Sequence, residues 1–240
     1  MHQWQCLRQA GGAAAMAMER ICEPELMDDA EQARAYADAD FAAGDRALLD
    51  RLEALFGPQL GPRIIDLGCG PGNISFLLAE RYPTARVLGL DGAPAMLAIA
   101  AARLPATPAR WPGLSFQHLL LTPGGALPDE GRWTAVVSNS LLHHLHDPLV
   151  LWQAVRRLAA PGAAICIKDL RRPEDAAALD TLVQRHAAAA PPVLRRDYAL
   201  SLRAAFRRTE VEAQLQRAGI EGLAVRELDD RYLEIWGRLG

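Results

Sequence analysis

Short apolar runs alternate along the middle of the chain with segments whose apolar residues recur at intervals of three and four. An unbroken apolar run of five to seven residues is typical of a strand buried on both faces of a parallel sheet. The intervening segments have the spacing of amphipathic helices. The pattern therefore predicts an α/β domain with strands at residues 63–67, 86–91, 114–120, 133–138 and 163–169.

The regions on either side of this block have a different character. Residues 30–40 and 47–56 have helical patterns, and they lie within a predicted pair of N-terminal cap helices spanning residues 19–60. Residues 1–18 are rich in Ala, Gly and Gln without a period, and we expect a loose N-terminal tail there. Residues 19–240 are expected to form a single domain.

The C-terminal third adds an insertion and a final hairpin. Residues 171–208 are predicted to be a helical insertion over the active site, with a helix at 176–190 and a less regular remainder. A helix follows at 209–218, where Thr209 and Glu212 have the spacing of a capping box. Residues 222–228 and 232–236 are predicted to form the last two strands.

The first predicted strand runs directly into alternating glycines, Asp66-x-Gly68-x-Gly70-x-Gly72, and then into a helix that Asn73 is expected to cap. Glycine permits backbone angles that other residues avoid, and it lets a ligand approach the main chain. The helix N-terminus then offers free N–H groups. This arrangement predicts a nucleotide-like cofactor site. A dinucleotide fingerprint would need glycine where Asn73 stands, and no P-loop sequence occurs.

The glycine segment resembles motif I of the class I S-adenosylmethionine-dependent methyltransferases. Two later patterns resemble the same family: Val-Ser-Asn-Ser-Leu-Leu-His-His-Leu at 137–145, and Arg-x-Leu-x-x-Pro-Gly at 156–162. The resemblance covers residues 64–169. It implies a Rossmann-like, mostly parallel sheet of seven strands in the order 3-2-1-4-5-7-6, with helices on both faces and a closing hairpin.

The resemblance also implies a set of residues around S-adenosylmethionine and its product, S-adenosylhomocysteine. In that family the acid and the glycine loop surround the methionine end, and Gly92 and Met96 match positions that flank the adenine. Asp91 ends the second strand at the separation that places a ribose-binding carboxylate in nucleotide folds. The predicted cofactor residues are Tyr36, Asp66, Gly68, Gly70, Gly72, Asn73, Asp91, Gly92, Met96 and Asn139.

One family feature is missing after the third strand, where many members carry an acid that binds the adenine amino group. This chain has Leu119-Leu120-Leu121 there, so backbone groups near Leu120 or Leu121 are the alternative adenine contacts. Tyr36 is interpreted either as a cover for the cofactor or as a packing aromatic.

For catalysis, His143 is the predicted general base and Asp169 the alternative. No metal site is predicted, because His143, His144 and His146 have no partner at metal-ligand spacing. Four arginines of the insertion either anchor an acidic acceptor or form a solvated face: Arg171, Arg172, Arg195 and Arg196.

The composition argues against some classes of partner and cellular location. The formal net charge of −3 over 240 residues gives no broad basic field, so a nucleic-acid partner is not indicated. No apolar run approaches the roughly 18 residues of a membrane span. The four cysteines form no C-x-x-C pair, which favours reduced thiols and a cytoplasmic location.

These observations predict methyl transfer from S-adenosylmethionine to a small-molecule acceptor enclosed by the cap helices and the insertion. The alternatives are an RNA-modifying methyltransferase, a nicotinamide-dependent oxidoreductase, which Asn73 argues against, and a non-catalytic S-adenosylmethionine-binding regulator or scaffold protein. The acceptor, the methylated atom and the oligomeric state stay open.

Overall fold

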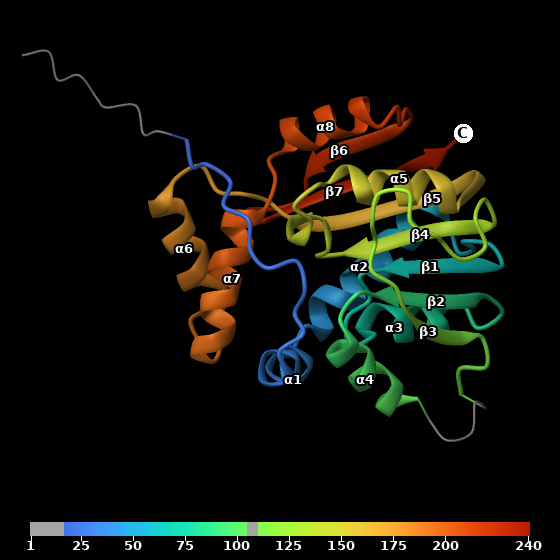
Figure 1. The fold of residues 1–240 in the computed structure, drawn as a ribbon, viewed down its shortest axis with the longest axis horizontal. Helices are drawn as coiled ribbons and strands as arrows, with labels where there is room; N and C mark the ends of the chain where they lie inside the picture. Colours follow the sequence, from blue (N-terminus) through green and yellow to red (C-terminus); the bar gives the residue numbers. More distant parts are fainter. Residues whose placement is uncertain (1–16, 105–109) are drawn as a thin grey trace, which may run out of the picture.

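The computed structural model describes residues 17–104 and 110–240 and contains one seven-stranded sheet in the order β3-β2-β1-β4-β5-β7-β6 (Figure 1). All neighbours are parallel except β7, which runs antiparallel to both β5 and β6. The predicted topology is confirmed. The strands are β1 (Arg63–Leu67), β2 (Arg86–Asp91), β3 (Leu114–His118), β4 (Trp133–Asn139), β5 (Ala159–Leu170), β6 (Leu223–Glu227) and β7 (Tyr232–Leu239).

Helices cover both faces of the sheet. Because successive side chains of a strand point to opposite faces, Ile65 packs with α5 (Leu149–Leu158) and α8 (Arg208–Arg217) on one side. Ile64 packs with α2 (Ala42–Phe56) and α3 (Asn73–Arg81) on the other. This two-sided burial explains why the central strands are continuous apolar runs rather than alternating ones.

A third group of helices lies beside the carboxyl ends of the parallel strands, at the left of Figure 1. It comprises α1 (Ala30–Asp38), α6 (Ala176–Ala187) and α7 (Pro192–Ala204), and α1 contacts both α7 and α4 (Pro94–Arg103). The short 3-10 helix η1 (Leu142–His144) follows β4 and contacts α7. The N-terminal helices and the insertion therefore meet over one end of the sheet.

Several local expectations were wrong. Gly72, not Asn73, is the N-cap of α3, and Asn73 is its first helical residue. The capping interaction of α8 lies two residues earlier than predicted, because the Arg207 N–H donates to the Glu210 carboxylate at 2.7 Å. The remainder of the insertion is not irregular: Pro192 begins α7, consistent with the preference of proline for a first helical turn.

The strand ends also shift from the predicted boundaries. β3 stops at His118, before the leucines that follow it, whereas β5 starts four residues before the predicted strand, at Ala159. That early start coincides with a register irregularity against β4 between Trp133 and Ala135.

The segment before α1 is tied to the insertion. The Met18 N–H donates to the Glu174 carbonyl at 2.8 Å, and the Met18 carbonyl accepts from Arg172 and Arg207. Arg20 donates to the carbonyls of His143 and Leu145 at 3.0 and 2.9 Å. The part of the predicted tail before Ala17 lies outside the described residues.

Among the described residues, no helix combines the length and apolarity that crossing a membrane would require. Cys22, Cys69 and Cys166 are free thiols.

Candidate functional site

The glycine loop joins β1 to α3 in a conformation that only glycine adopts readily. Gly68, Gly70 and Gly72 all have positive φ angles, of 69°, 52° and 85°. A Cβ atom on Gly68 would meet Leu141 at 2.8 Å, and one on Gly72 would meet Phe116 at 2.7 Å. A Cβ atom on Gly70 would meet nothing within 4 Å. Packing therefore leaves no room for a side chain at Gly68 or Gly72, whereas the space beside Gly70 is open.

Two buried acids support this loop. Asp91, at the end of β2, accepts from the N–H groups of Gly70 and Ala93 at 2.7 and 2.8 Å, one on each carboxylate oxygen. An ionised carboxylate has about four acceptor sites, so two remain for a ligand. Asp66 accepts from the Ser75 hydroxyl at 2.6 Å. Burial raises the pKa of Asp66 to about 7 and also raises that of Asp91.

A cavity of about 890 Å³ opens beside the loop, at the carboxyl ends of the parallel strands. Its size is within the range of ligand pockets, about 300–1,000 Å³. Nine of the ten predicted cofactor residues line it: Tyr36, Asp66, Gly68, Gly70, Asn73, Asp91, Gly92, Met96 and Asn139. Gly72 does not line the cavity and instead turns the chain into α3.

The rest of this side of the cavity is apolar. Met96 is buried with Ala33 of α1 and Ala93, and Tyr36 packs against the same cluster. Leu120 and Leu121 also line the cavity, where an adenine-binding acid stands in many family members. Because both leucines lie in the cavity wall, their backbone groups are placed where adenine contacts are predicted. These contacts stay a prediction.

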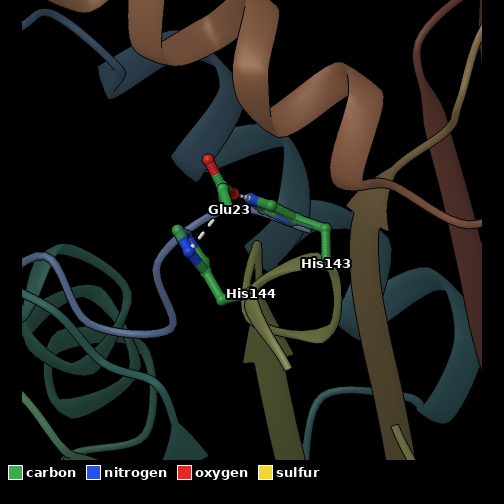
Figure 2. Close-up of side chains that lie close together, drawn as sticks. All are labelled: Glu23, His143 and His144. Atoms are coloured by element: carbon green, nitrogen blue, oxygen red, sulfur yellow. Dashed lines mark ion pairs between the residues drawn. The ribbon is translucent and has the colours of Figure 1, made fainter. Parts of the chain in front are cut away.

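His143 and His144 line the cavity, and Glu23 of the N-terminal segment lies beside them (Figure 2). His143 is 2% exposed, and its Nδ1 lies 2.6 Å from Asp169 Oδ1. Its Nε2 faces Glu23 Oε1 at 3.5 Å. Burial alone would lower the pKa of His143, but the carboxylates of Asp169 and Glu23 outweigh it and raise this pKa.

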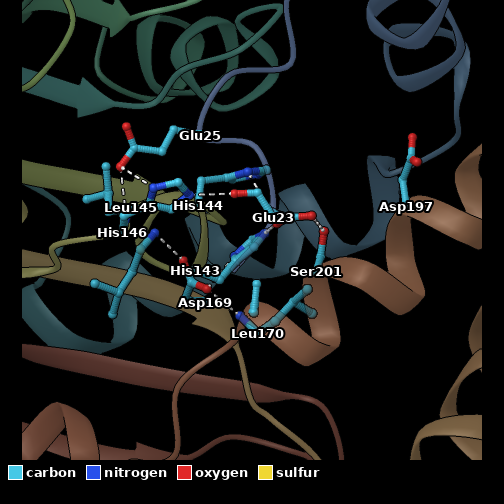
Figure 3. Close-up of polar contacts among 12 residues, drawn as sticks. Glu23, Glu25, His143, His144, Leu145, His146, Asp169, Leu170, Asp197 and Ser201 are labelled. Atoms are coloured by element: carbon cyan, nitrogen blue, oxygen red, sulfur yellow. Dashed lines mark hydrogen bonds and ion pairs between the residues drawn. The ribbon is translucent and has the colours of Figure 1, made fainter. Parts of the chain in front are cut away.

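Asp169 contacts the Nδ1 side of His143, whereas Glu23 lies on its Nε2 side (Figure 3). Besides His143, its carboxylate accepts from the N–H groups of Leu142 and Leu170 at 2.7 and 2.8 Å. It does not line the cavity. These bonds make Asp169 an orienting group for His143 and its loop, which argues against Asp169 as the base.

The predicted insertion arginines do not reach the cavity. Arg171 pairs with Glu227, Arg196 with Asp197, and Arg195 donates to the Ala188 carbonyl. Arg172 is 4% exposed and pairs with Glu210, so it is neither an acceptor anchor nor part of a solvated face. Both interpretations of Arg172 were wrong because its side chain points toward the N-terminal segment and α8.

Two other cations line the cavity instead. Lys168, from β5, and Arg231, from the β6–β7 turn, lie on the Tyr232 ring, with Nζ and Cζ at 4.1 and 4.8 Å from the ring centroid. Within residues 17–104 and 110–240, neither forms an ion pair with a carboxylate, and the Nε of Arg231 is buried without a hydrogen-bond partner. A lysine inside an otherwise apolar strand was the sequence signal for Lys168. Arg231 had none.

The sequence is similar to those of known methyltransferases. A family model described as "Methyltransferase domain" matches residues 65–165. Curated relatives include trans-aconitate 2-methyltransferases from Methylobacterium radiotolerans, 39% identical over 46% of this chain and 39% of the relative, and from Streptomyces coelicolor, 40% identical over 52% and 41%. The chain thus matches about two-fifths of these relatives' length.

Solved structures match over a larger part of the chain. A SAM-dependent methyltransferase from Aquifex aeolicus superposes with a TM-score of 0.64 at 16% identity, covering 88% of this chain and 99% of that one. The plantazolicin methyltransferase BpumL, solved in complex with a triazolic desmethylPZN analog and SAH, gives a TM-score of 0.64 at 12% identity, covering 88% of this chain and 92% of that one.

The chain carries a methyltransferase domain over residues 65–165 and has the fold of the class I S-adenosylmethionine-dependent methyltransferases. The family, fold and cofactor predicted from the motifs are thereby confirmed. The residues present also fit that cofactor. Gly70 has an open face, Asp91 keeps free acceptor sites, and the Asn139 amide oxygen is buried in the cavity wall without a hydrogen-bond partner. An ammonium group such as that of the methionine end would satisfy this amide oxygen.

Proposed function

We propose that this methyltransferase transfers a methyl group from S-adenosylmethionine to a small acceptor that carries a carboxylate. The observation that carries the proposal is the pair of cations, Lys168 and Arg231, in the wall of the cavity that contains the glycine loop. Among the described residues neither cation forms a direct ion pair with a carboxylate, although Asp45 lies near Lys168, so both can bind an anionic ligand.

The cofactor end of the cavity has the groups that S-adenosylmethionine needs. We assign the ribose hydroxyls to Asp91, the methionine ammonium to Asp66 and Asn139, and the close backbone approach to Gly70. Tyr36 and Met96 are assigned to the apolar surround of the cofactor, with Gly68, Asn73 and Gly92 contributing to its wall. Gly72 acts indirectly, through the turn that presents the loop.

The relatives support an acidic acceptor. The curated matches are named trans-aconitate 2-methyltransferases, and the substrate in that name is a carboxylic acid. On this proposal, Lys168 and Arg231 would hold one carboxylate of the acceptor while a second one reacts. Burial lowers the pKa of Lys168, and an anionic acceptor would favour its charged form.

Bound S-adenosylmethionine would supply an electrophilic methyl group on its sulfonium. A carboxylate acceptor already has a lone pair, so the protein needs to align it and exclude water; alignment alone is worth up to about 7–11 kcal/mol. The packing of α1 against α4 and α7 would enclose the reacting groups. For a hydroxyl acceptor we assign the base to His143, oriented by Asp169.

The test is transfer of labelled methyl from S-adenosylmethionine to a panel of small acids, with trans-aconitate as the first probe. We expect Lys168→Met and Arg231→Met each to raise KM at least about tenfold, because a hydrogen bond to a charged group is worth about 1.5–3 kcal/mol. Arg195→Met is the matched control, since Arg195 is a cation that lies outside the cavity.

The same assay separates the alternatives when total RNA and a mixture of neutral metabolites are added as acceptors. Label entering RNA, or neutral acceptors preferred over acids, would refute the acidic-acceptor proposal. Cofactor binding without transfer to any fraction would favour a non-catalytic regulator.

A further inference from the structure

Glu23, His143 and His144 present three ligand atoms to one point (Figure 2). Glu23 Oε1 lies 3.5 Å from His143 Nε2 and 3.3 Å from His144 Nδ1, and all three atoms lie within 4.8 Å of one another. Both separations exceed the usual N–H···O range of about 2.7–3.2 Å. Glu23 Oε1 and His144 Nδ1 are buried and have no hydrogen-bond partner among the described residues.

The two separations from Glu23 match those between the ligands of a metal ion. A metal ion binds histidine nitrogen at about 2.0–2.1 Å and carboxylate oxygen at about 2.0–2.2 Å, so tetrahedral ligands lie about 3.3–3.5 Å apart. Two histidines and one glutamate also form a known set for a metal site that keeps one position open. The cluster therefore has the ligand types and spacing for a first-row divalent cation.

Hydrogen bonds with Asp169 and Ser201 hold His143 and Glu23 with their remaining ligand atoms directed toward the cluster (Figure 3). Asp169 accepts from His143 Nδ1, which leaves Nε2 as the free nitrogen, and Ser201 donates to Glu23 Oε2 at 3.1 Å, which leaves Oε1 free. A carboxylate behind a ligating histidine is a recurrent feature of metal sites, because it fixes the tautomer and makes the ring more basic.

The charges nearby are compatible with a cation. Two buried carboxylates lie against His143, Glu23 at Nε2 and Asp169 at Nδ1. Arg20 is the nearest opposing charge; its guanidinium donates to the His143 and Leu145 carbonyls and not to either carboxylate. Arg20 offsets one negative charge, and a divalent ion at the cluster would offset the rest.

We propose that Glu23, His143 and His144 bind a divalent first-row transition-metal ion, with Zn²⁺ as the cation to test. The site joins the N-terminal segment to the loop after β4, two regions that are about 120 residues apart in the sequence. Both histidines line the cavity, so the ion would lie in its wall. In the metal-bound form His143 is a ligand and not a base, which is compatible with a carboxylate acceptor.

The test measures metal binding directly, without cofactor or acceptor, so it stands apart from the methyl-transfer proposal. The full chain is stripped with a chelator and titrated with Zn²⁺ by calorimetry, and Co²⁺ is used for an absorption spectrum of the ligand field. We expect one ion per chain and a tetrahedral Co²⁺ spectrum. Glu23→Gln and His144→Asn should each weaken Zn²⁺ binding about 100-fold or more, since even outer partners are worth about 10–100-fold.

Matched controls lie next to the cluster. Glu25 and His146 form an exposed pair with atoms 3.8 Å apart, so Glu25→Gln and His146→Asn repeat the same chemical changes two residues away. We expect both control variants to bind Zn²⁺ like the wild type. Equal affinities for Glu23→Gln and Glu25→Gln, or a Co²⁺ spectrum without tetrahedral features, would overturn the proposal in favour of a proton shared by Glu23 and the histidines.

A thermal measurement covers variants that are poorly folded. A ligand that binds only the folded chain raises the melting temperature. Zn²⁺ should therefore raise the melting temperature of the wild type and of Glu25→Gln, and leave that of Glu23→Gln unchanged. A rise of equal size in all three proteins would show binding elsewhere and would refute the assignment.

Discussion

The cavity has two walls, one formed mainly by backbone groups and the other by side chains. Its cofactor wall, formed by the β1–α3 loop and the end of β2, consists largely of backbone groups held by Asp91 and of glycines with positive φ. The wall that we propose for the acceptor consists of side chains, with Lys168, Tyr198, Ser201 and Arg231 contributed by β5, α7 and the β6–β7 turn.

The backbone wall has features that members of a family share, whereas the side-chain wall has features particular to one chain. A backbone cradle depends on a strand, a turn and a helix that are adjacent in sequence, so it leaves a local signature. A wall of side chains depends on how distant segments pack, and single substitutions alter it without changing the fold. The cofactor wall therefore indicates the family, and on our proposal the acceptor wall selects the acceptor.

The largest expected effect is on the cofactor wall. Asp91→Ala should weaken S-adenosylmethionine binding about 10–100-fold, because it removes charge-assisted hydrogen bonds worth about 1.5–3 kcal/mol. The measurement is calorimetric titration, with the exposed Glu80→Gln as control. Unchanged affinity would exclude Asp91 as the ribose ligand. We expect the KM for the acceptor to change far less than the cofactor affinity, which would separate the two walls.

The next effect concerns the segment that connects the walls. Arg20 donates to the Ala204 carbonyl as well as to those of His143 and Leu145, and its guanidinium lies 3.9 Å from the Phe206 ring centroid. Arg20→Ala should lower the free energy of unfolding by about 2–3 kcal/mol in chemical denaturation. Glu19→Ala, at an exposed neighbour, should leave it unchanged. Equal stability of both variants would mean that Arg20 does not hold the N-terminal segment.

A smaller effect, on the pH dependence of stability, follows from Asp45, which lines the cavity near Lys168. Burial raises the pKa of Asp45 from 3.8 to about 6, and Lys168 opposes this shift. The folded chain therefore keeps this proton between about pH 4 and 6, where the unfolded chain has lost it, so this contribution to stability falls as pH rises through that window.

Asp45→Asn removes this pH-dependent cost. We expect the variant to be more stable than the wild type at pH 8, by about 1–2 kcal/mol, and no more stable at pH 4. Denaturation at several pH values measures the difference. A difference that does not vary with pH would show that Asp45 is ionised throughout this range in the folded chain.

The smallest expected effect is that of removing the predicted tail. Deleting residues 1–16 should leave the melting temperature and cofactor affinity unchanged, because the composition of that stretch gives it no apolar face to bury. Extending the deletion through Arg20 should lower the melting temperature, since Met18 and Arg20 bind the insertion and the loop after β4. A large loss from the shorter deletion would show that the tail packs on the domain.

The sequence by itself was sufficient for the existence of the seven strands and for the glycine loop, because strand patterns and glycine spacing are local properties of the chain. The sheet order followed from the resemblance to the methyltransferase family rather than from any local pattern. The sequence was also sufficient to identify His143 as a residue of the cavity. It misassigned the caps of α3 and α8, where neighbouring residues compete for the same backbone N–H groups and geometry decides between them.

Only the tertiary structure decided which charged residues face the cavity. Lys168 lies near the end of β5 and Arg172 lies two residues past it, yet Lys168 lines the cavity whereas Arg172 pairs with Glu210 outside it. Glu23 meets His143 and His144 only through the docking of the N-terminal segment. Side-chain direction and contacts between distant segments depend on packing across the whole domain, and no local pattern encodes them.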